Sequence, residues 1–178
     1  MPDNNEQANQ ETPSIPYRLR QLAKLPRGAY VRGRNEQPCL IQVRLPKTRE
    51  VRQIFKVFKF IDRQLTSEDY RLPIRVAMNL AVFLITKSPE VGAYTAQQVV
   101  ILNAGLIDCI DFEEFAVTIA HELLHIVEAK EDGMDLSAHS ESEARHDLMV
   151  YALLGVGIPR SHWAFRKFPH LLQEIQEP

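Results

Sequence analysis

The chain has 178 residues, of which 45% are hydrophobic and 25% charged, as is typical of one globular domain with a buried core. Its first ten residues are polar and lack the basic and apolar regions of a signal peptide. The longest apolar stretch, residues 76 to 85, is too short to span a bilayer. With only two cysteines, Cys39 and Cys109, neither a disulfide framework nor a cysteine-based zinc knuckle can form. We therefore expect a cytoplasmic protein that does not contact a membrane.

The net charge of −2 hides an asymmetry along the chain. Residues 17 to 63 contain 13 Lys and Arg but 3 acidic residues, whereas residues 64 to 178 contain 8 Lys and Arg and 17 acidic residues. Such a division can mark a surface for nucleic acid or for an acidic partner, or a basic segment that packs on an acidic half. Because the basic residues are scattered rather than clustered, we favour internal packing.

The first elements follow a polar tail. Residues 1 to 16 contain almost no large apolar side chains and are predicted to be disordered. Residues 29 to 31 and 40 to 45 are typical of two short strands around a polar turn. Apolar residues at helical spacing predict an amphipathic helix over residues 48 to 65. Residues 72 to 86 fit either a helix or a strand, with Pro73 marking the start of the element.

The second half predicts one strand and two helices. Residues 99 to 102 (VVIL) form a β-branched run that is typical of a strand. Asp111 is a suitable N-cap for a helix that runs to about residue 129. A loop over residues 130 to 140 leads to a second helix over residues 141 to 154, which Gly155 closes. The aromatic residues that follow are interpreted as packing residues: His162, Trp163, Phe165 and Phe168.

The first of these two helices carries the motif HELLH, from His121 to His125. On a helix, residues four apart lie on one face, so both imidazoles can reach a single metal ion. Glu122 lies beside that face, where it can accept a proton from a metal-bound water as general base. The flanking residues are largely apolar, and burying these polar groups without a partner would be costly. The motif therefore predicts one zinc ion, with His121 and His125 as ligands; two satisfied core histidines are the alternative.

A third protein ligand is expected, because catalytic zinc usually has three and keeps one position open. Glu143 is favoured, since Asp147 follows one helical turn later on the same face. The glutamate could bind zinc while the aspartate accepts a hydrogen bond from a histidine ligand. Glu143 could instead complete a capping box with Ser140. Glu141 is the next candidate ligand and His139 the third.

Through His121, Glu122, His125, Glu143 and Asp147 the chain resembles the gluzincins, the thermolysin-like metallopeptidases, which carry HExxH and a second helix with ExxxD. Over residues 72 to 160 (VVILNAG, HELLH, ESEARHDLMVYALLGVGIP) it is also similar to the compact ImmA/IrrE-type metallopeptidases. Those proteins are intracellular, and several cut or inactivate a repressor-like partner. The resemblance implies a zinc peptidase with a protein substrate or a regulatory protein partner.

Two positions depart from this pattern: Leu124 replaces a usual glycine, and residues 145 to 147 replace small residues after Glu-Ala. The second departure leaves the third ligand open among Glu143, Glu141 and His139; the last would give a three-histidine site like that of the SprT group. His146 and Tyr151 could donate a hydrogen bond to an oxyanion beside the metal. Both residue types are more often ordinary packing or surface residues. Asp147 could likewise be a solvated helix charge.

We predict a compact, zincin-like α+β domain over residues 17 to 178, with a small sheet packed on the HExxH helix and on a second ligand-bearing helix. Residues 17 to 65 would form a basic hairpin and helix, and residues 66 to 178 the zinc-binding core. The expected function is zinc-dependent peptide hydrolysis, with an antiparallel edge strand near residues 99 to 102 holding the substrate.

Two other functions remain open. A regulatory binding protein could keep the zinc site without catalysis and dock through its basic amino-terminal segment. A DNA-associated protein could use the same segment for the phosphate backbone.

Overall fold

The computed structural model describes residues 28–32, 38–109, 111–128, 140–171 and 173. It has a mixed α+β fold with two small sheets. Strand β1 (Gly28–Arg32) pairs antiparallel with β2 (Pro38–Gln42). The second sheet has the order β3-β5-β4, made of β3 (Val82–Thr86), β5 (Val99–Asn103) and β4 (Ala93–Ala96). The helices are α2 (Thr48–Gln64), α3 (Glu68–Leu80), α4 (Ala104–Cys109), α5 (Phe112–Glu128), α6 (Glu141–Leu154) and α7 (Trp163–Lys167).

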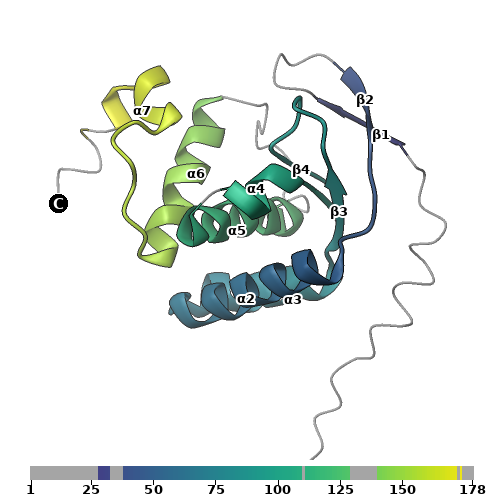
Figure 1. Cartoon of the computed structure of the whole chain (residues 1–178). Helices are drawn as coiled ribbons and strands as arrows, with labels where there is room; N and C mark the ends of the chain where they lie inside the picture. The colour runs from purple at the N-terminus through teal and green to yellow at the C-terminus, as the bar shows by residue number, and fades with distance from the viewer. Residues whose placement is uncertain (1–27, 33–37, 110, 129–139, 172, 174–178) are drawn as a thin grey trace, which may run out of the picture.

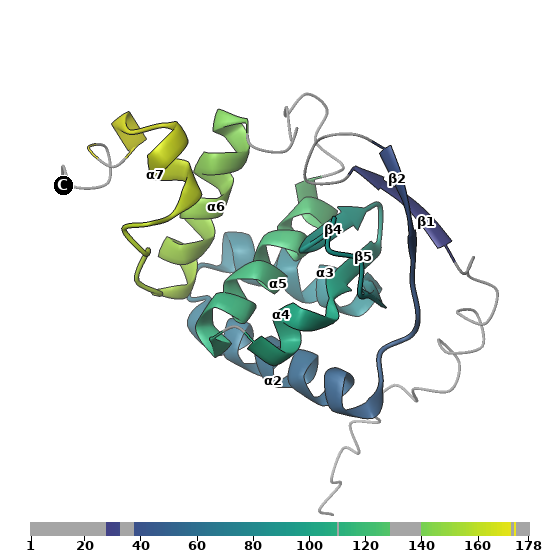
Figure 2. The ribbon, with the colours of Figure 1, turned by 45° about the horizontal axis from the view of Figure 1, so that its top comes forward.

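Helix α5 lies at the centre of the fold. It packs against α2, α3, β4 and α6, and both views show it enclosed by these elements (Figures 1 and 2). The helix begins where the sequence predicts, because the Asp111 carboxylate accepts a 2.8 Å hydrogen bond from the main-chain N–H of Glu113. No helix in the described part of the chain has both the length and the apolar character that a membrane crossing requires.

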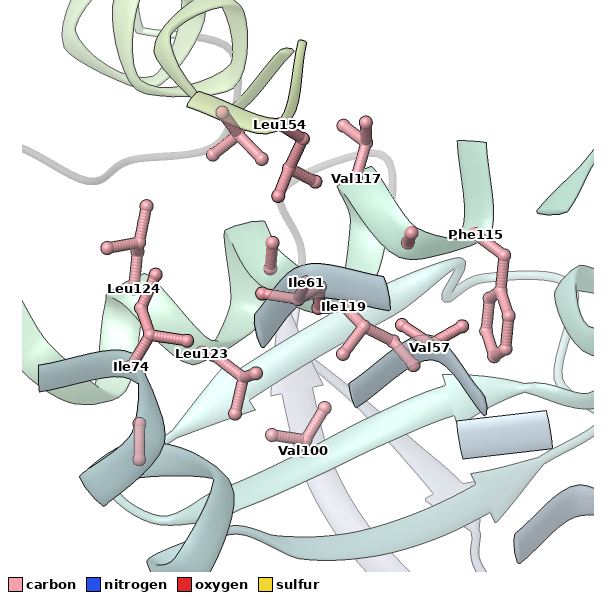
Figure 3. Packing of buried hydrophobic residues seen from close by; sticks show 14 of the residues in the cluster. Val57, Ile61, Ile74, Val100, Phe115, Val117, Ile119, Leu123, Leu124 and Leu154 are labelled. Carbon is pink, nitrogen blue, oxygen red and sulfur yellow. The ribbon is translucent and has the colours of Figure 1, made fainter. Parts of the chain in front are cut away.

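The main core forms where α5 meets α2, α3 and the three-stranded sheet (Figure 3). Ile119 and Leu123 of α5 are fully buried there, in a cluster that includes Ile61 of α2, Ile74 of α3 and Val100 of β5. Each such side chain stabilises the fold by about 1.5–3 kcal/mol. Because α2 belongs to this cluster, the predicted amphipathic helix is part of the same core as the HELLH helix.

The segment that the sequence left ambiguous contains both kinds of element. Helix α3 ends at Leu80, and β3 begins at Val82. The prediction that Pro73 marks the start of the element is wrong, because α3 begins at Glu68 and Pro73 lies inside it. A proline there removes one donor of the helix ladder, and its ring crowds the carbonyl four residues earlier. The apolar residues around it, including Ile74, keep the segment packed on the core.

The prediction of an edge strand at residues 99–102 is also wrong. Strand β5 lies between β3, with which it is parallel, and β4, with which it is antiparallel. Strand β4 is an edge of this sheet, since it pairs only with β5 among the described strands. On the other side of the sheet, Arg44 bridges to Ile85 of β3. In the described part of the three-stranded sheet, the edge strand near the HELLH helix is therefore β4 (Ala93–Ala96).

Ion pairs between the basic segment and the acidic half are sparse. Among the described side chains of residues 38–63, Arg49 alone pairs with an acid from that half, at 2.9 Å from Asp108. Arg44 instead pairs with Glu50 inside the basic segment. Helix α2 of the basic segment does pack on α5 of the acidic half, as expected, but through apolar side chains rather than through ion pairs of its basic residues.

Candidate metal centre

His121 and His125 lie one turn apart on α5, on the side that faces α6. Their Nε2 atoms are 2.8 Å apart, and the rings meet edge to face at 4.5 Å between centroids. His121 is only 7% exposed. The apolar residues of α5 fix this orientation, because Leu123 packs into the main core on the opposite side of the helix. The structure therefore directs both imidazoles of the motif to one point.

Helix α6 brings Glu143 to the same point. Its Oε1 atom lies 2.9 Å from Nε2 of His121 and 3.6 Å from Nε2 of His125. The main-chain N–H of Glu143 donates to the Ser140 hydroxyl at 3.0 Å, which caps α6. The half of a capping box that uses the main chain of Glu143 is thus present, and this half leaves the carboxylate to the histidines.

His146 also lies in this cluster. It follows Glu143 by three residues on α6 and is 4% exposed. Its ring centroid is 4.6 Å from that of His121 and 4.8 Å from that of His125. One ligand atom from each of His121, His125, Glu143 and His146 lies within 4.8 Å of the other three. The structure therefore brings a fourth donor beside the predicted three.

The donor atoms fit a zinc ion. Zinc bonds of about 2.0–2.2 Å at tetrahedral angles place neighbouring ligand atoms about 3.3 Å apart. The separations of 2.8, 2.9 and 3.6 Å among His121, His125 and Glu143 lie on either side of this value. The Oε2 atoms of Glu143 and Glu122 are buried without a hydrogen-bond partner in the described residues. A metal ion with its bound water would satisfy such atoms, and two imidazoles with one carboxylate form a typical catalytic zinc site.

Asp147 contacts the second ring nitrogen of His121. Its Oδ1 atom lies 3.0 Å from Nδ1 of His121, on the side of the ring away from Glu143. Its Oδ2 atom accepts a 2.6 Å hydrogen bond from Nε1 of Trp163 and lies 3.3 Å from Nε2 of His162. Asp147 thus approaches a histidine ligand as expected, but the expected hydrogen bond lacks the geometry of one, because Nδ1 of His121 is a buried atom without a hydrogen-bond partner in the described residues.

The carboxylates are held in their charged form by the cluster. Burial alone would raise the pKa of Glu143, but hydrogen bonds with His121 and His125 outweigh it and lower that pKa to about 2. Burial opposes the charge of Asp147 too, yet its contacts with His121 and His162 hold its pKa well below the usual range. Burial lowers the pKa of His121, but Asp147 and Glu143 raise it more, with a contribution from the nearby charge of Glu122. The site is thus built around negative charge that attracts a cation.

Glu122 is placed beside the cluster and tied to the sheet edge. Its side chain is buried, at 6% exposed. Its main-chain carbonyl accepts a hydrogen bond of 3.3 Å from the Thr95 hydroxyl of β4. The residue predicted as general base therefore lies where α5 meets the edge strand.

The other candidates lie elsewhere. Glu141 is partly exposed and pairs with Arg145 at 2.9 Å and with His170 at 3.1 Å, outside the cluster. The Tyr151 hydroxyl donates a 2.6 Å hydrogen bond to Glu114, and burial with this contact raises the pKa of Tyr151. His139 lies outside the described residues.

The interpretation of residues 162–168 as packing residues is incomplete. Phe165 is indeed buried against Leu148 of α6. Trp163 and His162, however, contact Asp147. No sequence spacing indicates this contact, because the chain turns back between α6 and α7 (Figure 2). The Trp indole N–H was the one available signal, since it needs a partner when buried.

Comparisons with known protein families, with curated proteins and with solved structures find no match to this chain.

Proposed function

We propose that the chain is a zinc-dependent peptidase, with His121, His125 and Glu143 as ligands. The observation that carries the proposal is the convergence of these three donors on one buried point beside Glu122. A buried cluster of this kind is costly unless a ligand satisfies it. Its composition matches catalytic zinc sites in which the fourth position stays open for water.

Each side chain of the site has its own role in the proposed peptide hydrolysis. A bound zinc ion supplies a water of lowered pKa and polarises the substrate carbonyl. Glu122 accepts the proton of that water as the peptide carbon is attacked, and then delivers it to the leaving amine. Asp147, 3.0 Å from Nδ1 of His121, would favour the tautomer that leaves the Nε2 lone pair of His121 free to hold a metal ion. His146 stands beside the cluster, where a donor would stabilise the developing oxyanion.

Strand β4 is the proposed binding edge for the substrate. Its main-chain groups on the side away from β5 have no strand partner in the described part of the sheet. An extended peptide could pair there by strand addition. The hydrogen bond from Thr95 to the Glu122 carbonyl fixes this edge relative to the general base. The edge thus replaces residues 99–102 as the proposed docking strand.

The catalytic part of the proposal is tested with Glu122→Gln and Glu113→Gln. Glu113 is an exposed glutamate on the same helix and gives the matched control. We expect the wild type and Glu113→Gln to cleave members of a peptide library, monitored by mass spectrometry, and Glu122→Gln to bind zinc without cleavage. Equal cleavage by Glu122→Gln would exclude the proposed general base.

The ligand assignment is tested by zinc content after dialysis. About one zinc per chain is expected in the wild type and in Glu141→Ala, because Glu141 points to Arg145 and His170. His125→Ala and Glu143→Ala should lose most of it. Full zinc in Glu143→Ala together with loss in Glu141→Ala would reverse the assignment.

A non-catalytic, zinc-containing binding protein is the second candidate, and the position of His146 favours it. A site with four protein ligands is closed and structural, whereas a site with three is open to water. If His146 is a fourth ligand, His146→Ala will weaken zinc binding as strongly as His125→Ala. If it is an oxyanion donor, the variant will keep zinc and lose peptide hydrolysis.

A further inference from the structure

We propose that helix α7 is part of the metal centre, with Trp163 and His162 acting as positioning residues for His121 through Asp147. The inference rests on the proposed metal site and extends it to a segment that the motif does not include. It predicts that zinc affinity depends on a hydrogen bond made two residues away from the metal, at the surface where α6 and α7 pack together.

The first observation is that the two carboxylate oxygens of Asp147 contact different residues. Oδ1 faces Nδ1 of His121 at 3.0 Å, while Oδ2 accepts from Nε1 of Trp163 at 2.6 Å. A carboxylate held at one oxygen alone can rotate about its last torsion angle, which is broad for aspartate. The indole N–H removes this freedom. Trp163 therefore fixes the direction in which Asp147 presents its other oxygen to His121.

The second observation concerns the tautomer of His162. Its Nδ1 atom accepts a hydrogen bond of 3.3 Å from the main-chain N–H of Ala164, at the start of α7. A neutral imidazole that accepts at Nδ1 carries its proton on Nε2. That Nε2 atom lies 3.3 Å from Oδ2 of Asp147. His162 thus presents a donor to the same oxygen as Trp163, and both orient the carboxylate.

The third observation is that α7 is firmly anchored. Ala164, Phe165 and Leu171 are buried in a cluster with Ala144 and Leu148 of α6. This cluster holds the indole at the side of α6 that carries Asp147. A donor on a packed helix is preorganised, so little conformational entropy is lost when it bonds. The contact of Trp163 with Asp147 is thus held by the packing of α7 on α6, and Asp147 in turn contacts His121.

The central test compares Trp163→Phe with Phe165→Leu, in the full chain. Trp163→Phe keeps an aromatic ring but removes the N–H, so we expect about tenfold weaker zinc binding, the lower end of the range for groups that orient a metal ligand. Phe165→Leu removes buried apolar volume from α7 without touching the Asp147 contact. It should lower the thermal midpoint of the metal-free protein and weaken zinc binding less than Trp163→Phe does, because it loosens the anchor of α7 but keeps the indole N–H. Zinc affinity is measured by competition with a chromophoric chelator.

A double-variant cycle tests the route through Asp147. In an Asp147→Ala background, Trp163→Phe should weaken zinc binding no further, because the group through which it acts is gone. An equal loss in both backgrounds would overturn the route. Trp163 is also the only tryptophan of the chain, so its emission reports directly on this contact. Saturating zinc should change that emission in the wild type, and an unchanged emission would overturn the coupling.

The outcomes separate this inference from the metal site itself. A wild-type protein that binds no zinc overturns both the proposed metal site and the proposed role of α7. A wild-type protein that binds zinc, with Trp163→Phe within about twofold of it at equal folding, overturns the role of α7 and leaves the three ligands in place. A larger loss of affinity in Trp163→Phe than in Phe165→Leu supports it, since general loosening of α7 would weaken zinc binding in both variants alike.

Discussion

Helix α5 has two buried sides whose groups are satisfied in different ways. On one side Ile119 and Leu123 lie in a hydrophobic cluster with residues of α2, α3 and the sheet (Figure 3). On the other side His121 and Glu122 are almost as buried, at 7% and 6% exposed, and His121 contacts Glu143 and His125. There the Oε2 atom of Glu122 finds no hydrogen-bond partner among the described residues.

This difference separates the residues that stabilise the fold from the residues that would bind a metal ion. Apolar burial is complete once the helices pack, and it stabilises the fold with no further component. The polar side holds buried charge that the protein itself satisfies only in part, which opposes folding until a cation binds. Folding stability should therefore depend on one side of α5, and metal affinity on the other.

The largest expected effect on stability comes from Leu123→Ala on the apolar side. Leu123 is fully buried in the main core, so its truncation should lower the free energy of unfolding by about 3 kcal/mol. Urea unfolding of the metal-free protein measures this. His125→Ala is the matched variant two residues along the helix, on its other side, and should lower metal-free stability less than Leu123→Ala does while abolishing zinc binding. Loss of zinc binding by folded Leu123→Ala would show that the two sides are not independent.

Zinc removal should have the next largest effect. A ligand that binds only the folded state stabilises it by about 2.7 kcal/mol at a free concentration 100 times its dissociation constant. We therefore expect chelation to lower the unfolding free energy of the wild type by about this amount, measured by urea unfolding with and without zinc. In His125→Ala the two curves should coincide. Stabilisation of that variant by zinc would place the metal elsewhere.

Several elements of the fold and three residues of the site could be predicted from local patterns in the sequence. Apolar periodicity predicts α2, and the capping signals at Asp111 and Gly155 predict α5 and α6 to within a few residues, because stripes and caps are local information. The HELLH spacing and the position of Glu143 predict three donors that the structure brings together. Helical geometry carries the prediction for His121 and His125, since residues four apart share a face, whereas the prediction for Glu143 depended on the spacing to Asp147 and on the resemblance to the gluzincins.

What the sequence could not predict depends on contacts between distant segments. The edge position of β4 follows from strand order, which the short and weakly apolar Ala93–Ala96 does not indicate. The contact of Trp163 with Asp147 depends on how the chain turns between α6 and α7. Whether His146 enters the cluster depends on the rotation of α6 against α5. Each of these is set by tertiary packing rather than by local pattern.

Glu50 is a buried carboxylate that the protein satisfies by itself, in contrast to Glu143. Arg44 donates two hydrogen bonds to it, of 2.7 and 2.6 Å, and the main-chain N–H of Lys47 donates a third, of 2.6 Å. The Arg44 hydrogen bonds lower the pKa of Glu50 below its ordinary 4.5, although burial opposes this. Glu50→Gln should therefore lower the free energy of unfolding by about 1.5 kcal/mol at pH 7, a value reduced by the partial exposure of Arg44.

The pH dependence of that difference has a defined sign. A carboxyl group whose pKa is lower in the folded than in the unfolded state stabilises the fold fully above the unfolded pKa, and loses this as the pH falls through the folded pKa. The gap between wild type and Glu50→Gln should thus be constant from pH 7 to about pH 5 and shrink below about pH 4. Urea unfolding of the metal-free proteins across this range measures it. A gap that grows on acidification would contradict the ion pair.

The smallest effect is expected at Ser140, where a helix cap and the metal side meet. Its hydroxyl accepts the main-chain N–H of Glu143, so Ser140→Ala should cost about 1 kcal/mol of stability. Ser67→Ala is the matched control, because Ser67 is the N-cap of α3 but its side chain makes no capping hydrogen bond, and its effect should be close to zero. Thermal unfolding of the metal-free proteins compares the two. Since the capped group is the main chain of a proposed ligand, Ser140→Ala should also weaken zinc binding, but less than Glu143→Ala, which removes the donor atom itself. Equal losses in the two variants would mean that the first turn of α6, rather than the Glu143 carboxylate, determines metal affinity.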